Sequence, residues 1–210
     1  MQIVDLIVVR NDATSEVNDL ASKFATLGVA VFTCNEKDME LAANTVAPQS
    51  ILARVVFHQV KQLGNKVVLL DGVADPGNVG TIIRCAAWFG FTDVVLAEKC
   101  ADVYNPKVVR AAAGATLRMN VHRHVKAEEF ISSAPSYQVV SAVPNGGEPP
   151  AILSALEPLI LVIGNEAHGV SARILSLTNH RVTIPGRGNV ESLNAAMAAA
   201  ILLYEGGKAQ

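Results

Sequence analysis

Three stretches of the sequence place polar residues where they could do chemistry. The first is DPGNVGTIIRCAAWFG at residues 75–90, in which Arg84 is the one charged residue of the apolar helical pattern at 79–89. Charged side chains are seldom placed among apolar residues without a partner or a task. Arg84 is therefore a candidate functional residue. The alternative is an arginine that reaches solvent from a packed helix, with Asn78 acting as the helix cap.

The second and third stretches also follow apolar strand patterns. LILVIGNEAHGV, residues 159–170, places Glu166 just beyond a strand, where it is either functional or a surface carboxylate in a turn. TIPGRGNVESLNAAMAAAILLYE, residues 183–205, has a glycine-rich loop and then Ser192 or Asn194 at the start of an alanine-rich helix. The backbone amides at that helix start could bind an anion. Because ligands in open α/β sheets lie beyond the carboxyl ends of strands, we expect the three stretches to form one site.

The elements that must position these residues alternate along the chain. Unbroken runs rich in Val, Ile and Leu, typical of strands covered on both faces, lie at 3–9, 29–33, 67–70, 93–97, 138–142, 159–163 and 181–184. Helical patterns lie between them at 16–27, 49–63, 79–89, 106–113, 171–177 and 192–205. The alternation predicts an α/β fold with a mainly parallel sheet and helices on both faces.

A domain boundary is predicted at residues 62–66, QLGNK, where a helical pattern ends before a new strand. It separates a small amino-terminal unit, 1–62, from a larger unit, 66–210. About 60 residues is near the lower limit for an independent core, so the first unit is expected to be incomplete or to lean on its neighbour.

Composition narrows the class of protein. The chain has 210 residues, half of them hydrophobic, a net charge of −2 and three widely spaced cysteines. We expect a globular cytoplasmic protein without a disulfide framework, and no apolar stretch reaches the roughly 20 residues that span a bilayer. One region stands out because it holds no acid: residues 103–127 form either a solvated face or a contact for a polyanion. Its cations are Lys107, Arg110, Arg118, Arg123 and Lys126.

Several familiar sites are disfavoured. Gly186 and Gly188 lack the third glycine and the later acidic residue of a dinucleotide-binding fingerprint. The sequence has no P-loop and no Gly-x-Ser-x-Gly elbow. His122 and His124 would lie on one side of a strand, but no third ligand has metal-site spacing, so no metal is expected.

Taken together, the three stretches resemble the motifs of the SpoU family of RNA ribose methyltransferases, in the SPOUT superfamily. DPGNVGTIIRCAAWFG resembles the first motif, LVIGNEAHGV the second and IPGRGNVESLNAAMAAAILLYE the third. YNPKVVRAAAGA, residues 104–115, resembles a stretch between the first two. The resemblance covers about residues 66–205. It implies methyl transfer from S-adenosylmethionine to a ribose 2′-hydroxyl of RNA, on an α/β sheet with a carboxyl-terminal trefoil knot.

The resemblance also implies roles for individual residues. The cofactor would lie against backbone groups at Gly164, Ile184 and Leu193, near Ala142. The catalytic residues implied are Arg84, Asn78, Glu166, Ser192 and Asn194. Because a guanidinium group stays protonated, we expect Arg84 to hold the 3′ phosphate and ribose, while Glu166 either orients Arg84 or takes the proton.

Partners follow from the same resemblance. Members of the family work as homodimers through the helix of the third motif, and residues 1–62 resemble the later part of an RNA-binding module like ribosomal protein L30. Ribosomal RNA is expected as substrate rather than transfer RNA. Two other functions stay open: a catalytically silent RNA-binding adapter of the same fold, and an α/β protein that binds a small ligand and no RNA.

Overall fold

The computed structural model describes residues 3–43, 47–56, 62–188 and 192–208. The chain divides into two compact units, Met1–His58 and Gln59–Gln210. The division lies just before the predicted boundary at residues 62–66.

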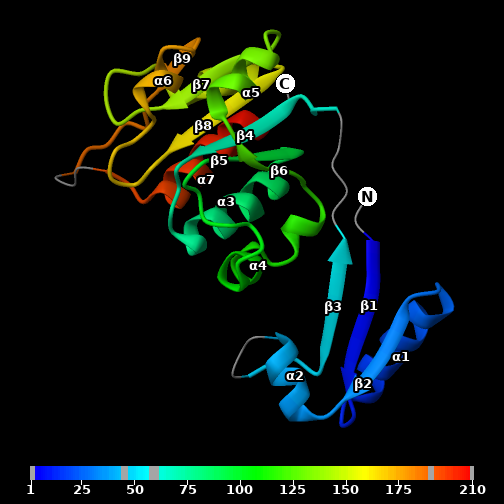
Figure 1. Ribbon diagram of the computed structural model, residues 1–210. Helices are drawn as coiled ribbons and strands as arrows, with labels where there is room; N and C mark the ends of the chain where they lie inside the picture. The colour runs from blue at the N-terminus through cyan, green and yellow to red at the C-terminus, as the bar shows by residue number, and fades with distance from the viewer. Residues whose placement is uncertain (1–2, 44–46, 57–61, 189–191, 209–210) are drawn as a thin grey trace. The chain divides into compact units, whose positions relative to one another are not determined.

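The first unit is a three-stranded sheet with two helices (Figure 1). Its elements are β1 (Ile3–Arg10), α1 (Ser15–Thr26), β2 (Ala30–Cys34), α2 (Glu36–Ala43) and β3 (Ile51–Val56). The strand order is β2-β1-β3, with β1 parallel to β2 and antiparallel to β3. A small core gathers around Ile7, Val9 and Ala21.

The helix predicted at 49–63 is wrong over its first half, because residues 51–56 form β3; residues 57–61 lie outside the described part of the chain. Three of the six residues of β3 are β-branched, which suits a strand. Pairing with β1, in which Val9 lies opposite Ile51, decides the conformation. α2 was not predicted because half of its residues are charged and it buries only Met39.

The second unit is a six-stranded, wholly parallel sheet in the order β6-β5-β4-β8-β7-β9. Its strands are β4 (Lys66–Asp71), β5 (Asp93–Ala97), β6 (Asn120–Val125), β7 (Gln138–Ala142), β8 (Leu159–Gly164) and β9 (His180–Val182). Its α-helices are α3 (Pro76–Trp88), α4 (Pro106–Ala112), α5 (Ala127–Ser133), α6 (Ala172–Leu175) and α7 (Ala195–Gly207). Two 3₁₀ turns, η1 (Ala115–Leu117) and η2 (Pro150–Ala155), complete it.

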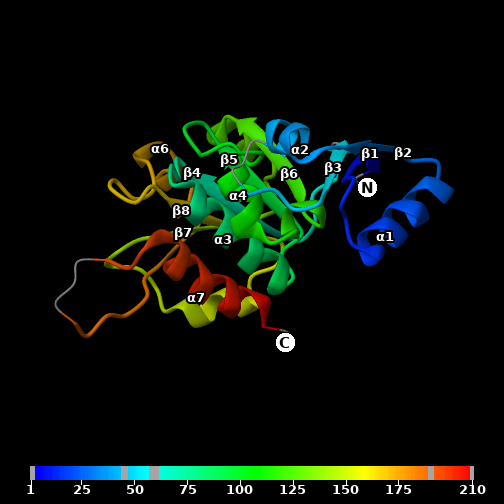
Figure 2. The same ribbon diagram turned by 90° about the horizontal axis from the view of Figure 1, so that it is seen from below.

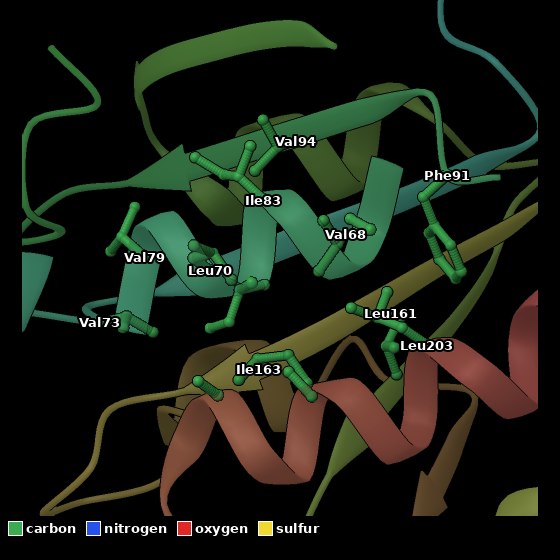
Figure 3. Close-up of a cluster of buried hydrophobic side chains, with 14 of the residues drawn as sticks. Val68, Leu70, Val73, Val79, Ile83, Phe91, Val94, Leu161, Ile163 and Leu203 are labelled. Atoms are coloured by element: carbon green, nitrogen blue, oxygen red, sulfur yellow. The ribbon is translucent and has the colours of Figure 1, made fainter. Parts of the chain in front are cut away.

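Helices cover both faces of this sheet, as predicted. Alternate residues of a strand point to opposite faces. On one face, Val68 and Leu70 of β4 pack with α3, α4 and α7, and Figure 3 shows Leu203 of α7 in this cluster. On the other face, Val67 and Leu69 pack with α5 and α6. The α/β prediction with a mainly parallel sheet is confirmed, and burial on both faces explains the unbroken apolar runs.

One glycine of α3, Gly80, allows α4 to approach closely. A Cβ atom on Gly80 would lie 2.5 Å from the carbonyl oxygen of Val108 and 2.6 Å from the Cβ of Ala111, both in α4. A Cβ atom on Gly77 would lie 3.6 Å from the Cε of Lys107. α4 therefore packs against the face of α3 that carries these glycines. α7 packs beside α3 as well (Figure 2).

A buried carboxylate, Asp93, stabilises the amino-terminal edge of the sheet. Its Oδ1 lies 2.9 Å from Nε2 of His122, and its Oδ2 accepts from Oγ1 of Thr92 at 2.7 Å and from the backbone N–H of Gly64 at 3.0 Å. Burial alone would raise the pKa of Asp93, but these hydrogen bonds outweigh it and the pKa is lowered. His122 thus has a structural partner. His124 is exposed with φ +53°.

Candidate active site

The site lies where the connections of two adjacent strands leave the sheet in opposite directions. β4 and β8 are neighbours, and Asp71 pairs with Gly164 at their carboxyl ends. The chain leaves β4 toward α3 on one face and leaves β8 toward α6 on the other. Such a switch point opens a crevice beyond the strand ends and is the usual ligand position in this class of sheet.

The first loop ends in a helix cap that differs from the predicted one. Asp75, not Asn78, caps α3: its Oδ1 accepts from the backbone N–H of Asn78 at 2.9 Å, and Pro76 occupies the first helical position. That hydrogen bond lowers the pKa of Asp75; desolvation opposes the change, and Lys107, whose Nζ lies 3.3 Å from Oδ2, lowers the pKa further. The side chain of Asn78 is left to make other contacts.

The second loop is held by Asn165. Its Oδ1 accepts from the backbone N–H of Ala167 at 2.8 Å, and its Nδ2 donates to the carbonyl of Gly72 at 2.8 Å. Backbone hydrogen bonds between Asn165 and Gly169 close the turn. Glu166 projects from this turn and is exposed.

Gly164 makes the same turn possible. A Cβ atom there would lie 2.2 Å from the backbone of both Gly169 and Val170. This is closer than any real Cβ contact, so only glycine allows the loop to fold back on the end of β8.

The third loop ends at Asn194, which caps α7. Its Oδ1 accepts from the backbone N–H of Ala196 at 2.9 Å and of Met197 at 3.3 Å. Of the two helix starts predicted, Ser192 and Asn194, the structure has Asn194 as the cap, and the helix begins at Ala195. Two of the amides expected to be available for an anion are already satisfied by Asn194.

The three loops meet at one point. Asn78 Nδ2 donates to Oε1 of Glu166 at 2.8 Å, and Asn78 Oδ1 accepts from Nδ2 of Asn194 at 3.1 Å. We call Asn78, Glu166 and Asn194 the three-loop node. The side-chain amide of Asn78 thus joins two residues that lie 88 and 116 positions further along the chain. The expected convergence of the three stretches is therefore observed.

Two predicted catalytic residues lie outside the node's hydrogen bonds. Arg84 is exposed, shares its side of α3 with the exposed Trp88, and forms no ion pair with any residue in the described ranges. Glu166 therefore does not orient Arg84 directly, because its carboxylate contacts Asn78 instead. Ser192 is exposed two residues before Asn194.

Three of the four predicted cofactor residues lie at or just after neighbouring strand ends, and the fourth, Leu193, directly precedes the cap of α7. Ala142 ends β7 and lies opposite Val182 of β9, while Gly164 ends β8 between β4 and β7. Ile184, two residues after β9, is half-buried against the core, and Leu193 is 47% exposed. The three residues at the strand ends offer backbone groups along one edge of the sheet, and Leu193 offers exposed apolar surface at the start of α7.

A cleft of about 900 Å³ lies elsewhere on the carboxyl edge, at the ends of β4, β5 and β6. Its lining includes Asp71, Lys99, Lys126 and Arg173, and none of the nine predicted site residues. Its charges are mixed and partly paired, as Lys126 is with Glu129.

Within the part of the chain that the structure describes, no three His, Cys, Asp or Glu residues come together as a metal site would require. None of the described helices combines the length and apolar character needed to span a membrane.

Sequence reasoning missed Asp75 and Asn165, which position the node without belonging to it. Asp75 could have been found, because an aspartate directly before a proline is a common helix start. Asn165 carries no such signal: its role depends on contact with Gly72, 93 positions earlier.

Comparison with known proteins agrees with this geometry. The profile of the SpoU rRNA Methylase family matches residues 65–204. A 23S rRNA (guanosine(2553)-2′-O)-methyltransferase, RlmP of Bacillus subtilis, is 35% identical over 181 residues, covering 84% of this chain and 72% of that protein. An uncharacterized tRNA/rRNA methyltransferase of Synechocystis is 30% identical over 200 residues, covering 91% of this chain and 72% of that protein.

Solved structures are similar over nearly the whole chain. The SpoU methyltransferase AviRb of Streptomyces viridochromogenes, in complex with AdoMet, superposes with a TM-score of 0.84 at 25% identity, covering 98% of this chain and 83% of that one. An AdoMet-bound rRNA methyltransferase of Sinorhizobium meliloti gives a TM-score of 0.82 at 27% identity, covering 98% and 80%.

Proposed function

Because the chain belongs to the SpoU rRNA methylase family, we propose that it transfers the methyl group of S-adenosylmethionine to a ribose 2′-hydroxyl of ribosomal RNA. The observation that carries the proposal is the three-loop node, which brings one polar residue from each family motif to a single place. Relatives with a named substrate, from Bacillus subtilis and Streptomyces viridochromogenes, are 23S rRNA 2′-O-methyltransferases.

S-adenosylmethionine fits the strand ends beside the node. Backbone groups at Gly164, Ile184 and Leu193, near Ala142, would hold it, and the two larger side chains offer apolar surface for an adenine ring. The bound cofactor supplies an electrophilic methyl group on a sulfonium. The tight turn at Gly164 keeps the loop that carries Glu166 close to that position.

The chain's own residues would then activate and hold the ribose. Glu166 takes the 2′-hydroxyl proton: Asn78 holds its Oε1, and its Oε2 accepts no hydrogen bond from another described residue. Arg84 binds the phosphate 3′ to the target ribose and stabilises charge developing on the 2′ oxygen. The 2′ oxygen would then accept the methyl group that bound S-adenosylmethionine supplies, and the sulfur would leave as a neutral thioether. Ser192, beside the node in sequence, contacts the ribose.

Methyl transfer is tested with tritiated S-adenosylmethionine and unmodified total RNA, fractionated into ribosomal and transfer RNA. We expect label in ribosomal RNA, resistant to alkaline hydrolysis of the following phosphodiester, and its loss in a folded Glu166→Gln variant. Label in transfer RNA would show that transfer RNA, and not ribosomal RNA, is the substrate. Alkali-sensitive label would place the methyl group on a base and refute ribose chemistry.

We further propose that the protein is a homodimer joined through α7. Its inner side, including Ala199 and Leu202, packs on the core, whereas Met197, Ile201 and Tyr204 form an exposed apolar stripe at helical spacing. Met197 is 60% exposed and Tyr204 51%, and both suit burial by a second copy. Light scattering should give a dimer for the wild type and a monomer for Met197→Glu.

Leu41→Glu is the matched control, because Leu41 is 75% exposed but lies on α2. A wild-type monomer, or equal effects of the two substitutions, would contradict a dimer through α7.

Two finer features of the fold are proposals from the same family. A trefoil knot is supported by the contacts of α7 with α3, η2 and β8, which come from distant parts of the chain. When the chain is pulled from both ends, a knot should keep its final length shorter than that of a fully extended chain. A chain that reaches its full length would exclude a knot.

Residues 1–62 are proposed as a reduced RNA-binding module like ribosomal protein L30, supported by a small αβ unit that precedes the catalytic one. Ultraviolet cross-linking of the full chain to RNA should yield labelled peptides from this unit as well as from residues 66–210. Labelled peptides from the latter alone would argue against it.

A further inference from the structure

α4 and the turn after it present basic side chains that the mechanism above leaves unused. Lys107 and Arg110 lie on α4, and Arg118 follows η1; all three are exposed. We call Lys107, Arg110 and Arg118 the α4 basic surface. No acidic residue occurs from position 103 to 127, so this surface carries charge of one sign along the chain.

Only part of that basic run is available for a partner. Arg123 is stacked on Tyr104 at 4.3 Å and lies 3.9 Å from Asp102, and Lys126 pairs with Glu129 at 2.9 Å. By contrast, Arg110 and Arg118 form no ion pair with any residue of the described ranges. Arg123 and Lys126 therefore interact with groups of the protein itself, whereas Arg110 and Arg118 face solvent.

The α4 basic surface adjoins the proposed catalytic site at its first residue. Lys107 Nζ lies 3.3 Å from Asp75, and Asp75 accepts from the backbone N–H of Asn78. The ammonium group is therefore one residue away from the three-loop node. Both side chains of the Lys107–Asp75 pair are about half exposed, at 59% and 47%, so the pair is screened and open to exchange with an anion.

Arg84 lies on the side of α3 that faces α4. At 100° per residue, a helical residue seven positions after Gly77 lies within about 20° of the same direction. Gly77 and Gly80 both point at α4, so Arg84 emerges beside the same helix, one turn beyond Gly80. Positive charge therefore continues from the node along the junction of α3 and α4.

We propose that the α4 basic surface binds the phosphate backbone of the RNA strand whose ribose reaches the three-loop node, an inference that rests on the proposed function. Two arginines suit this task because a guanidinium group donates two parallel hydrogen bonds to one phosphate. Such contacts set the register of the strand without reading its sequence. The surface then supplies RNA affinity that a chain with net charge −2 lacks as a whole.

The test is a double variant, Arg110→Gln with Arg118→Gln, compared with Arg173→Gln. Arg173 is the control because its side chain is 86% exposed, 3.9 Å from Glu128, and lies on α6, on the opposite face of the sheet. Filter binding of 23S rRNA fragments is measured across a salt series. Each phosphate contact to a single strand contributes about 0.7 to the slope of log affinity against log salt, so the double variant should lose about 1.4. At 0.15 M salt this corresponds to about tenfold weaker binding.

The enzymatic assay separates this surface from the active site. The double variant should raise KM for RNA about tenfold and leave kcat, calorimetric binding of S-adenosylmethionine and the melting temperature unchanged, and the control should leave all of them unchanged. Wild-type binding and salt slope in the double variant would overturn the proposal and favour an acidic protein as the partner. If the wild type binds RNA with this slope but methylates none, the surface stands and the proposed function fails.

Discussion

Asn194 performs two tasks that substitution can separate. Its Oδ1 caps α7 by accepting from Ala196 and Met197, and its Nδ2 donates to Asn78 at 3.1 Å. Asn194→Ala removes both. Asn194→Asp keeps an acceptor at the cap, and its charge suits the helix start, but it removes the donor to Asn78.

Asn194→Ala and Asn194→Asp are expected to differ in stability and to lose activity to the same extent. Loss of the cap costs about 1 kcal/mol and loss of the exposed hydrogen bond about 0.5 kcal/mol, so Asn194→Ala should lower the melting temperature by about 3–6 °C. Asn194→Asp should lower it by about 1–2 °C. Both variants release the amide of Asn78, which then no longer fixes Glu166, and methyl transfer should fall about 10²-fold in each.

Calorimetry and single-turnover methylation measure the two effects independently. Wild-type turnover in Asn194→Asp would show that contact with Asn78 is not needed for chemistry. Equal melting temperatures of the two variants would show that the cap is not what Asn194 contributes to stability.

Three more substitutions follow from the geometry. Gly164→Ala should cost about 3 kcal/mol of unfolding free energy and abolish calorimetric binding of S-adenosylmethionine, because its Cβ would lie 2.2 Å from backbone atoms. Gly186→Ala is the control: its Cβ would have nothing within 4 Å, so stability and cofactor binding should be retained. Equal effects of the two substitutions would contradict this account. Asp93→Asn should lower the free energy of unfolding by about 2 kcal/mol at pH 7. Folding lowers the pKa of Asp93, so the difference in unfolding free energy between wild type and variant should be complete above the unfolded pKa of about 3.9. It should shrink as the pH falls through the folded pKa. A difference that stays constant down to pH 2 in urea melts would contradict this prediction. Arg84→Lys keeps the charge but loses the planar fork, so kcat should fall at least about tenfold, and near-wild-type turnover would remove the bidentate role.

The central strands of the second unit were predictable from sequence because they are buried on both faces, whereas β6, which is half-buried or exposed, and the short helix α5 after it were not predicted. Runs such as residues 67–70 and 159–163 have no exposed side and therefore no polar residues, which separates them from the helices between them. The first unit was harder. Residues 51–56 have a sequence that suits either element, and pairing with β1, more than 40 positions earlier, makes them a strand.

The site was predictable in outline and not in detail. The rule that ligands lie beyond strand ends correctly brought Asn78, Glu166 and Asn194 together. It could not show that Asn78 bridges the other two instead of capping its helix, because that depends on Asp75 taking the cap. The family prediction is confirmed by the matching profile, and the roles of individual residues stay predictions.

The most direct measurement is a crystal structure of the protein with S-adenosylmethionine. We expect the sulfonium beside the three-loop node, with the nucleoside against Gly164, Ile184 and Leu193. Density for the donor in the cleft of about 900 Å³ at the ends of β4, β5 and β6, away from these residues, would contradict the assignment.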